Sequence, residues 1–267
     1  MKTIWLVVPC YNEEEVLPET SRQLKAVMNS MIERGKISSE SKITFVNDGS
    51  KDGTWDIISS LCAEDSLFAG INLSRNRGHQ NALLAGLMTA KKYADAAISL
   101  DADLQDDVDV VEKMVDNFLA GDDIVYGVRS SRKTDTFFKR FTAEGFYKFM
   151  AAMGVEIVFN HADYRLMSRR ALEALSEFEE VNLFLRGIVP QIGFKTSTVE
   201  YERKERLAGE SKYPLKKMIS FAFEGITSFS VKPLKMATTL GIFSLIVCFA
   251  MIIYCIVSKA TGHAVAG

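Results

Sequence analysis

The chain of 267 residues has little of what disulfide frameworks and zinc sites require. Its four cysteines show no C-x-x-C spacing, and its three histidines are scattered along the sequence. Zinc sites use Cys and His at short fixed spacings, and small secreted domains use paired cysteines. The sequence therefore predicts reduced, buried thiols, which fit a protein part that lies in the cytosol.

An excess of positive charge is also missing. The formal net charge is −2, whereas a domain that binds nucleic acid usually carries a basic face. We therefore expect no nucleic-acid partner. The charge is unevenly spread, however, because residues 203–235 contain eight Lys or Arg and only three Glu. A basic segment on an otherwise acidic chain favours a local anionic partner.

Two familiar motifs are absent near the start of the chain. No G-x-G-x-x-G follows the first predicted strand, which argues against dinucleotide binding. The N-terminus enters a strand at once and Pro9 interrupts its apolar run. This start is therefore not predicted to be a signal peptide.

One long charge-free run is present, over residues 237–258. A helix needs about 20 mostly apolar residues to cross a bilayer, so we predict a transmembrane helix over 236–259 and a short tail over 260–267. A buried core helix is the alternative, which the length disfavours. Lys232 and Lys235 precede the run and only Lys259 follows it closely. The positive-inside rule then places the preceding residues in the cytoplasm and the C-terminus outside.

Apolar runs alternate with helical stretches over the first half of the chain. Strands are predicted at Ile4–Val8, Ile43–Val46, Ala69–Leu73, Ala96–Leu100 and Ile124–Val128, with helices over 14–34, 54–63, 80–93 and 108–119. Such alternation indicates βαβ units, so we predict an α/β fold with a mostly parallel central sheet flanked by helices.

The pattern loosens after Val128. We predict an aromatic-rich helix over 137–153, short strands at Leu166–Met167 and Thr196–Tyr201, and a basic, amphipathic juxtamembrane segment over 214–235. An amphipathic helix of this kind suits the membrane interface. Packing of that helix on the domain itself is the alternative, since amphipathicity does not separate the two.

The fourth predicted strand ends in carboxylates. Asp101 and Asp103 are two residues apart, so an extended backbone would point both side chains the same way. Mg²⁺ is commonly bound by one or two carboxylates together with substrate phosphates. Ligands of open α/β sheets bind outside the carboxyl ends of the strands. The pair thus favours a metal site, with a solvated acidic turn as the alternative.

Polar clusters follow the other early strands as well. They are Pro9–Glu13, Asn47–Thr54 and Ser74–Gly78. Neighbouring parallel strands would bring these clusters to one edge of the sheet and form a crevice. There Tyr11 would cover a face of a nucleotide base and Asn12 or Asp48 would bond its polar edge, while Gly49 permits a tight turn close to a ligand.

These motifs together resemble family 2 glycosyltransferases with the GT-A fold. The resemblance lies in Val8–Glu13, Val46–Thr54 and Leu100–Asp106. The chain also resembles a subgroup that glycosylates polyprenyl or dolichyl phosphate. That resemblance lies in Leu73–Gly78 with Ala82 and Gly86, in Ala162–Leu166, and in Arg206 with Gly209–Tyr213. The resemblance covers residues 3–235 and extends into the apolar run. It implies a cytoplasmic catalytic domain over 1–213. Related membrane-anchored members often have two C-terminal spans, whereas one is evident here.

The resemblance also implies roles for individual residues. The nucleotide would be bound by Pro9, Tyr11, Asn12, Glu13, Asp48, Gly49, Asp101 and Ala102. Mg²⁺ or Mn²⁺ would be held by Asp101, Asp103 and Gln105, with Asp103 and Asp163 as catalytic residues. The acceptor phosphate would be bound by Arg129, Lys139, Arg203, Arg206, Ser211 and Lys212.

The activity implied is inverting transfer of a hexose from a nucleoside-diphosphate sugar, UDP-glucose or a related UDP-sugar, to a polyprenyl phosphate such as undecaprenyl phosphate. The lipid-linked product would serve cell-envelope glycan modification, and the protein would sit in the cell membrane with its catalytic domain facing the cytoplasm. An acceptor phosphate is already anionic, so arginine and lysine suit it. No residue identifies the sugar, and uridine rests on the resemblance alone.

Three alternatives stay open. One is a transferase acting on a sugar or lipid hydroxyl, which needs a general base such as Asp163. Another is a non-catalytic membrane protein that binds nucleotide sugars, which the intact carboxylate pair argues against. The basic segment alone also suits anionic lipid headgroups. Pairing of that segment with a second copy leaves a homo-oligomer open.

Overall fold

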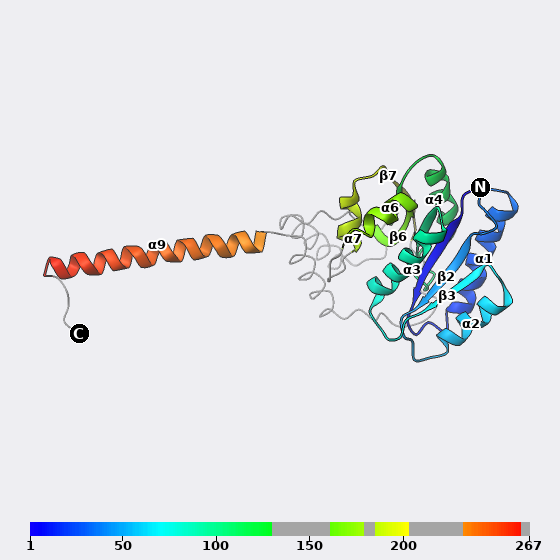
Figure 1. Ribbon diagram of the computed structural model, residues 1–267, viewed down its shortest axis with the longest axis horizontal. Helices are drawn as coiled ribbons and strands as arrows, with labels where there is room; N and C mark the ends of the chain where they lie inside the picture. Colours follow the sequence, from blue (N-terminus) through cyan, green and yellow to red (C-terminus); the bar gives the residue numbers. More distant parts are fainter. Residues whose placement is uncertain (130–160, 179–184, 203–231, 263–267) are drawn as a thin grey trace.

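The computed structural model describes residues 1–129, 161–178, 185–202 and 232–262 (Figure 1). Seven strands within these ranges form one sheet in the order β3-β2-β1-β4-β6-β5-β7. All neighbours are parallel except β6, which runs antiparallel to both β4 and β5. The strands are β1 (Ile4–Cys10), β2 (Lys42–Asn47), β3 (Phe68–Asn72), β4 (Ala96–Ser99), β5 (Ile124–Arg129), β6 (His161–Ser168) and β7 (Thr196–Tyr201). The expected mixed, mostly parallel sheet is confirmed.

Helices cover both faces of this sheet. The helices of the domain are α1 (Leu17–Glu33), α2 (Thr54–Glu64), α3 (His79–Tyr93), α4 (Val110–Leu119), α6 (Arg169–Leu175) and α7 (Leu185–Ile188), followed by the 3₁₀ turn η1 (Val189–Ile192). One apolar cluster joins α1, α2 and α4 to the sheet, and a second joins α3, α6 and α7 to the opposite face. The two clusters make this a three-layer α/β domain.

The sequence of β1 shows why the sheet is buried on both sides. Its residues Ile4–Val8 do not alternate with polar residues, because a strand covered on both faces reads as a continuous apolar run. Ile4 and Leu6 pack in the cluster of α1 and α4, whereas Trp5 and Val7 pack in that of α3. Full burial of one such side chain contributes roughly 1.5–3 kcal/mol, so β1 anchors both layers.

The strand β6 differs most from the sequence-based expectation. A strand was expected only at Leu166–Met167, but it spans His161–Ser168. Arg165 lies opposite Ser99 in the register with β4. Because β6 is antiparallel to β4 and β5, its first residues lie beside the last residues of β4. This reversal brings Asp163 to the edge of the sheet that carries Asp101.

The packing of α3 on the sheet explains one glycine of the polyprenyl-type pattern. A Cβ atom at Gly86 would lie 2.3 Å from Cγ1 of Val7 and 2.9 Å from Cγ2 of Val46. Such distances are far inside van der Waals contact, so only glycine lets α3 approach β1 and β2 this closely. The approach fixes where α3 begins, which matters for the site below.

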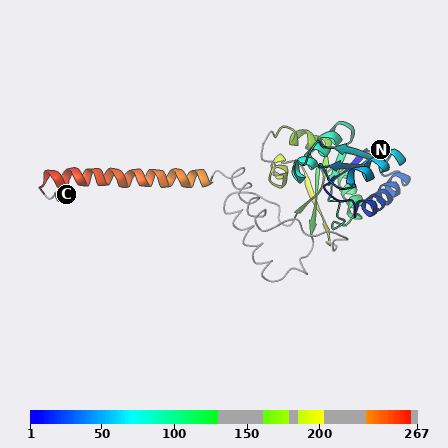
Figure 2. The ribbon, with the colours of Figure 1, turned by 90° about the horizontal axis from the view of Figure 1, so that it is seen from below.

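The helix α9 (Lys232–Ala260) extends away from the α/β domain (Figures 1 and 2). Within its residues Leu234–Ala260, the most apolar 18-residue stretch has a mean hydropathy of 2.8, and none of that stretch is buried in the protein. By length and composition this helix is able to cross a membrane. The boundaries expected at 213/214 and 235/236 stay predictions, since residues 203–231 lie outside the described ranges.

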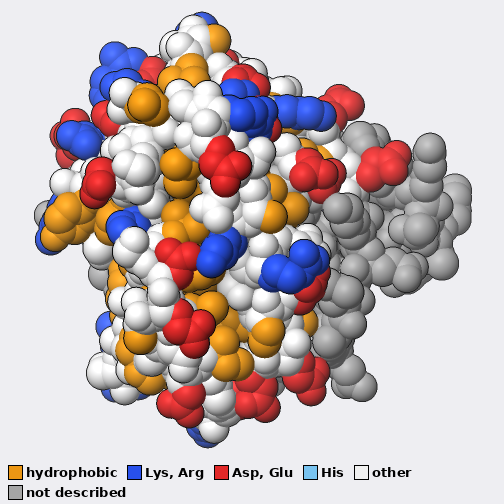
Figure 3. Space-filling view, turned by 90° about the vertical axis from the view of Figure 1, so that its right-hand side faces the viewer, with side chains coloured by type: hydrophobic (Ala, Val, Ile, Leu, Met, Phe, Trp, Pro, Cys, Tyr) orange, Lys and Arg blue, Asp and Glu red, His pale blue; other side chains and the backbone are white. Residues whose placement is uncertain are grey.

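The face of the domain turned away from α9 carries acidic and basic side chains next to one another (Figure 3). One ion pair on the surface of the domain joins Arg34, at the end of α1, to Glu112 of α4, 2.7 Å apart. Interspersed charges of both signs give this face no single polarity, as is usual for a solvated surface.

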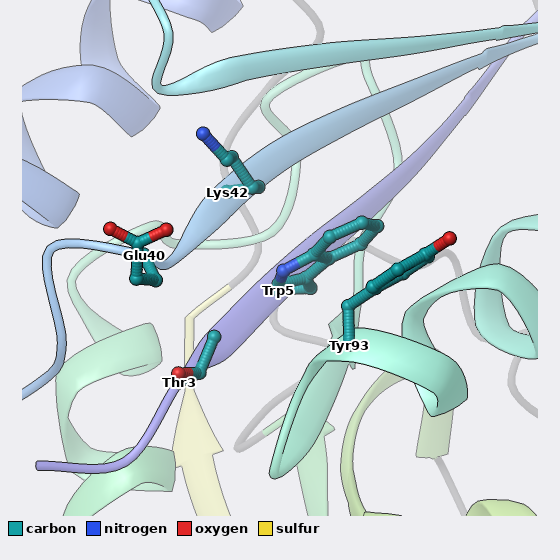
Figure 4. Close-up of a pocket in the computed structure, with 5 residues that line it drawn as sticks. All are labelled: Thr3, Trp5, Glu40, Lys42 and Tyr93. Carbon is teal, nitrogen blue, oxygen red and sulfur yellow. The ribbon is translucent and has the colours of Figure 1, made fainter.

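A pocket of about 450 Å³ lies at the edge of the sheet where β1 and β2 begin (Figure 4). It is lined by Thr3, Trp5, Glu40, Lys42 and Tyr93. The rings of Trp5 and Tyr93 stack with centroids 5.5 Å apart. Because ligands of open α/β sheets bind at the carboxyl ends of the strands, this pocket is not part of the site described next.

Candidate active site

The polar clusters that follow β1 and β2 meet at the carboxyl edge of the sheet. The backbone N–H of Asn12 donates to Ser50 Oγ at 3.0 Å, and Asn12 Oδ1 accepts from the N–H of Lys51 at 2.9 Å. The N–H of Glu13 donates to Thr54 Oγ1 at 2.9 Å. These hydrogen bonds hold the turn after β1 beside the turn after β2. The segment Pro9–Glu13 thus lies beside the turn that contains Asp48 and Gly49, as expected.

Asp48 connects this pair of turns to the loop after β3. Its side chain is buried, and its carboxylate accepts from the N–H of Arg77 at 2.6 Å and from the N–H of Gly78 at 2.9 Å. Hydrogen bonds to a charged group are among the stronger ones in proteins. Besides the nucleotide role expected of it, Asp48 therefore shapes the turn from which α3 starts.

Gly49 lies in the left-handed region, with φ at +66°, against the loop after β3. A Cβ atom there would lie 2.5 Å from the backbone N of Asn76. We expect Gly49→Ala to lower the free energy of unfolding by roughly 1–3 kcal/mol, because backbone cannot move aside as a side chain can. Thermal unfolding of the variant measures this loss.

Gly35→Ala is the matched control, because Gly35 has φ at +65° and a Cβ atom there would lie 4.0 Å from its nearest neighbour, Sδ of Met1. That variant carries the same backbone strain without the collision. Equal losses in the two variants would show that the close approach at Gly49 contributes nothing.

The acidic segment follows β4, and its shape differs from expectation. The strand ends at Ser99, Asp101 lies outside any regular element, and Asp103 lies in a turn. The turn is formed by Leu104, with φ at +55°, and by Asp103 Oδ1, which accepts from the N–H of Gln105 at 3.1 Å. The C=O of Ala102 accepts from the hydroxyl of Thr20 at 2.6 Å. The carboxylate pair thus follows the strand and is not part of it, and the common direction of the two side chains stays a prediction.

The two carboxylates differ in exposure and charge environment. Asp103 is buried, whereas Asp101 is half-buried, with 40% of its side chain open to solvent. Despite that opening, surrounding protein atoms desolvate Asp101, and with the charges of Asp163 and Asp103 they raise its pKa. Carboxylates that disfavour one another's charge are a feature of sites that take a cation.

Asp163 sits in a buried cluster of charged and polar side chains. Arg165, 1% exposed, donates to its Oδ1, and Arg186 donates to its Oδ2 at 3.0 Å. Gln80 Nε2 also donates to Oδ2, at 3.3 Å. His79 Nε2 lies 3.8 Å from the same oxygen and 3.6 Å from Asp101 Oδ1, so it stands between the two carboxylates.

The charges around Asp163 decide its protonation. Burial alone would raise the pKa of this carboxyl, but Arg186, Arg165 and His79 together hold it well below its usual range. A carboxylate held so firmly in its charged form is a weak proton acceptor. Its described surroundings suit an anion that orients neighbouring cations.

Arg129 lies on the other side of the acidic segment, at the end of β5. Its guanidinium is 3.6 Å from Asp106 Oδ1, and its Nε donates to the Tyr201 hydroxyl at 3.4 Å. That hydroxyl donates in turn to Asp106. Burial and the charge of Asp101 raise the pKa of Asp106 to about 6, although Tyr201 and Arg129 oppose this. The structure thus puts Arg129 within reach of the acidic segment.

The other residues expected to bind the acceptor phosphate cannot be placed in this way. Lys139, Arg203, Arg206, Ser211 and Lys212 all lie outside the described residues. The same holds for the helix predicted over 137–153 and for the motif Gly209–Tyr213. Their roles stay predictions.

The donor set suits a metal shared with a substrate. Within the ranges that the structure describes, no three Asp, Glu, His or Cys side chains converge as a complete metal site. Asp101 and Asp103 supply carboxylate oxygens and Gln105 a carbonyl oxygen, which are the donor types that Mg²⁺ and Mn²⁺ prefer. These residues therefore fit a divalent cation whose remaining ligands are water and diphosphate oxygens.

Several residues of this site were not anticipated from the sequence. They are His79, Gln80, Ser99, Asp106, Arg165, Arg186 and Tyr201. His79 and Gln80 directly follow the Ser74–Gly78 cluster, which was the available signal for them. Arg165 lies inside Ala162–Leu166, one of the segments that carry the family resemblance. No feature of the sequence pointed to Arg186.

Comparison with known proteins agrees with this geometry. The model of the family described as Glycosyl transferase family 2 matches residues 5–176. An uncharacterized glycosyltransferase, YkoT of Bacillus subtilis strain 168, is 54% identical over 262 residues, which cover 98% of this chain and 78% of the relative. The bactoprenol glucosyl transferase of Shigella phage SfV is 42% identical over 244 residues, or 90% of this chain and 76% of the relative.

A solved structure shows the same fold at much lower identity. Glucosyl-3-phosphoglycerate synthase from Mycobacterium tuberculosis, in complex with Mn²⁺, UDP and phosphoglyceric acid, superposes with a TM-score of 0.54. The match covers 84% of this chain and 76% of that protein, with 16% identical residues. At this identity the likeness concerns the fold, and it agrees with the expected GT-A architecture. With the family match over residues 5–176, these comparisons show that the chain belongs to glycosyl transferase family 2.

Proposed function

We propose that this protein transfers glucose, with inversion, from UDP-glucose to a polyprenyl phosphate such as undecaprenyl phosphate. Relatives named as bactoprenol glucosyl transferases, 42% identical along 90% of the chain, support a lipid-phosphate acceptor and glucose as the sugar. The lipid-linked sugar would serve glycan modification in the cell envelope. UDP as the carrier rests on the family resemblance.

The observation that carries this proposal is the environment of Asp163. A hydroxyl acceptor has to lose its proton during the reaction, which calls for a base with a pKa near the working pH. Asp163 is the carboxylate expected at the reacting centre, and Arg165 and Arg186 hold its pKa low. A phosphate acceptor is already anionic and needs no such base. The site therefore favours a phosphate over a sugar or lipid hydroxyl.

On the donor side, Asp101, Asp103 and Gln105 would hold Mg²⁺ or Mn²⁺ together with the diphosphate. When bound, the cation offsets the negative charge that grows on the leaving diphosphate. The nucleotide would be contacted by Pro9, Tyr11, Asn12, Glu13, Gly49 and Ala102. Asp48 would hold the loop that follows β3 in place. The task of the protein is to bring two anions together.

On the acceptor side, Arg129 would receive the lipid phosphate together with Lys139, Arg203, Arg206, Ser211 and Lys212. Arginine suits a phosphate because its donors engage two oxygens at once. The helix α9 would cross the membrane, with the catalytic domain on the cytoplasmic side where the basic segment 203–235 meets the headgroup. This arrangement would place the acceptor phosphate at the bilayer surface.

The test uses membranes that contain the full chain, with labelled UDP-glucose, Mg²⁺ and undecaprenyl phosphate. We expect a chloroform-soluble product whose mass equals one hexosyl phosphate on the lipid. Undecaprenol, which lacks the phosphate, is the matched acceptor control. Equal transfer to undecaprenol would favour a hydroxyl acceptor, and donor binding without any product would favour a nucleotide-sugar-binding protein.

Removal of the metal is expected to stop the reaction. Treatment with EDTA should reduce product formation to background, because the diphosphate would lose its counter-charge in the transition state. Adding Mg²⁺ or Mn²⁺ in excess should restore it, and initial rates over a range of each metal measure the preference. Full activity in EDTA after extensive dialysis would contradict the assignment of Asp101 and Asp103.

A further inference from the structure

Arg129 and Tyr201 lie opposite each other at the ends of two neighbouring strands. The strands β5 and β7 run parallel, and Arg129 is the partner of Tyr201 in their register. Both strands end at these residues. Side chains that are partners in a parallel pair point to the same face of the sheet. Tyr201 is buried, whereas 29% of the Arg129 side chain is exposed. A buried tyrosine thus supports an arginine that reaches solvent.

The hydroxyl of Tyr201 bonds two charged side chains at once. Its oxygen accepts from Arg129 Nε at 3.4 Å, and its proton is donated to Asp106 Oδ1. A tyrosine hydroxyl has one proton and a guanidinium has no acceptor, so the direction of both bonds is fixed. Burial and the negative charge of Asp106 raise the pKa of Tyr201. The hydroxyl therefore keeps the proton that it donates.

The guanidinium of Arg129 is held along one edge. Its Nε faces the hydroxyl of Tyr201, and its Nη2 lies 3.6 Å from Asp106 Oδ1. The guanidinium is planar and rigid, so fixing one edge also fixes the direction of the edge formed by Nη1 and Nη2. The hydroxyl contact thus sets the orientation in which Arg129 meets a ligand.

We propose that Tyr201 is a positioning residue that orients Arg129 for its contact with the phosphate of the lipid acceptor. The inference rests on the proposed function, which gives Arg129 that contact. An arginine binds a phosphate best through two parallel hydrogen bonds, so a rotation of the guanidinium weakens both at once. Tyr201 acts through Arg129 and not on the substrate.

Tyr164 offers an internal comparison. Its ring packs edge-on against that of Tyr201, with centroids 5.4 Å apart, and it is also buried. Its hydroxyl donates to the C=O of Asp107 at 2.9 Å. Both tyrosine hydroxyls thus bond the acidic segment, but within the described ranges only that of Tyr201 also bonds Arg129. Loss of either hydroxyl removes a buried hydrogen bond, and only one loss should affect the arginine.

The test compares Tyr201→Phe, Tyr164→Phe and Arg129→Gln in membranes containing the full chain, with UDP-glucose and undecaprenyl phosphate. Arg129→Gln is expected to raise the KM for undecaprenyl phosphate by about 10–100-fold, the usual range for loss of hydrogen bonds to a charged group. Tyr201→Phe should raise the same KM by about 3–10-fold, because positioning is lost while the arginine remains. The KM for UDP-glucose should stay within about twofold of the wild type in both variants.

The matched tyrosine variant separates positioning from a general loss of structure. Tyr164→Phe should leave both KM values near those of the wild type, although thermal unfolding should show a loss of stability similar to that of Tyr201→Phe. In the double variant of Tyr201→Phe with Arg129→Gln, the tyrosine change should add nothing to the acceptor KM, since residues that act through one another are not additive.

Four results would overturn the inference. They are an unchanged acceptor KM in Tyr201→Phe, an equal rise in Tyr164→Phe, an unchanged acceptor KM in Arg129→Gln, and effects that multiply in the double variant. Calorimetry with undecaprenyl phosphate in detergent distinguishes this failure from that of the proposed function. A wild-type protein that binds no acceptor defeats both, whereas binding with the same Kd in the wild type and in Tyr201→Phe defeats the inference alone.

Discussion

Replacing Asp103 by alanine is expected to lower the rate of sugar transfer by about a thousandfold or more, because a bound cation contributes several kcal/mol to transition-state charge stabilisation. Asp103 is 8% exposed and lies at the turn that presents the carboxylate pair. Loss of its carboxylate would leave Asp101 as the only carboxylate of the proposed pair. Initial rates of lipid-linked sugar formation, at saturating Mg²⁺ or Mn²⁺, measure the effect.

Asp109→Ala is the matched control for this prediction. Asp109 belongs to the same acidic stretch, but its side chain is exposed and makes no capping hydrogen bond to α4. Its loss removes the same charge from the segment without touching the pair, so activity should stay near that of the wild type. Thermal unfolding should show that Asp103→Ala remains folded. Transfer at the normal rate in a folded Asp103→Ala protein would refute the metal assignment.

Much of the sheet was predictable, and its central strands read as continuous apolar runs because both of their faces are buried. β1 and β2 were expected within one or two residues of where they occur, and Thr196–Tyr201 matches β7 in full. The strand β6 was predicted only near its C-terminal end, because Asp163 and Arg165 interrupt the apolar pattern. A sequence shows two charged residues there and does not show that they neutralise each other in the interior.

The candidate site was predictable where chemistry is local. The carboxylate pair and the turns at Asn12 and Asp48 follow strands directly, so the rule about strand ends located them. Gln80 and Arg186 were missed because their roles come from contacts over long sequence distances. Gln80 meets Asp163 across 83 residues, and Arg186 meets it across 23. Such pairings follow from the antiparallel insertion of β6, which the sequence did not reveal.

Of the substitutions that the described contacts allow us to predict, we expect Arg165→Met to destabilise the domain most. Arg165 is 1% exposed and bonded to Asp163, which is 6% exposed. Breaking a buried ion pair on one side typically costs about 3–5 kcal/mol, because the remaining charge stays buried with less compensation. A loss of that size lowers the melting temperature of a domain this large by roughly 10 °C. Thermal unfolding of the full chain in detergent measures it.

The contrast with a double substitution separates charge from packing. If the cost comes from an uncompensated carboxylate, Asp163→Asn combined with Arg165→Met should melt at a higher temperature than Arg165→Met alone, since removing both partners is milder than removing one. Arg22→Met serves as the surface control, because Arg22 pairs with Glu19 in solvent and such pairs contribute little. A double variant that melts below Arg165→Met would mean that the shape of Arg165, which also holds the C=O of Leu185, matters more than its charge. The helix α7, which carries Arg186, would then be kept in place by packing.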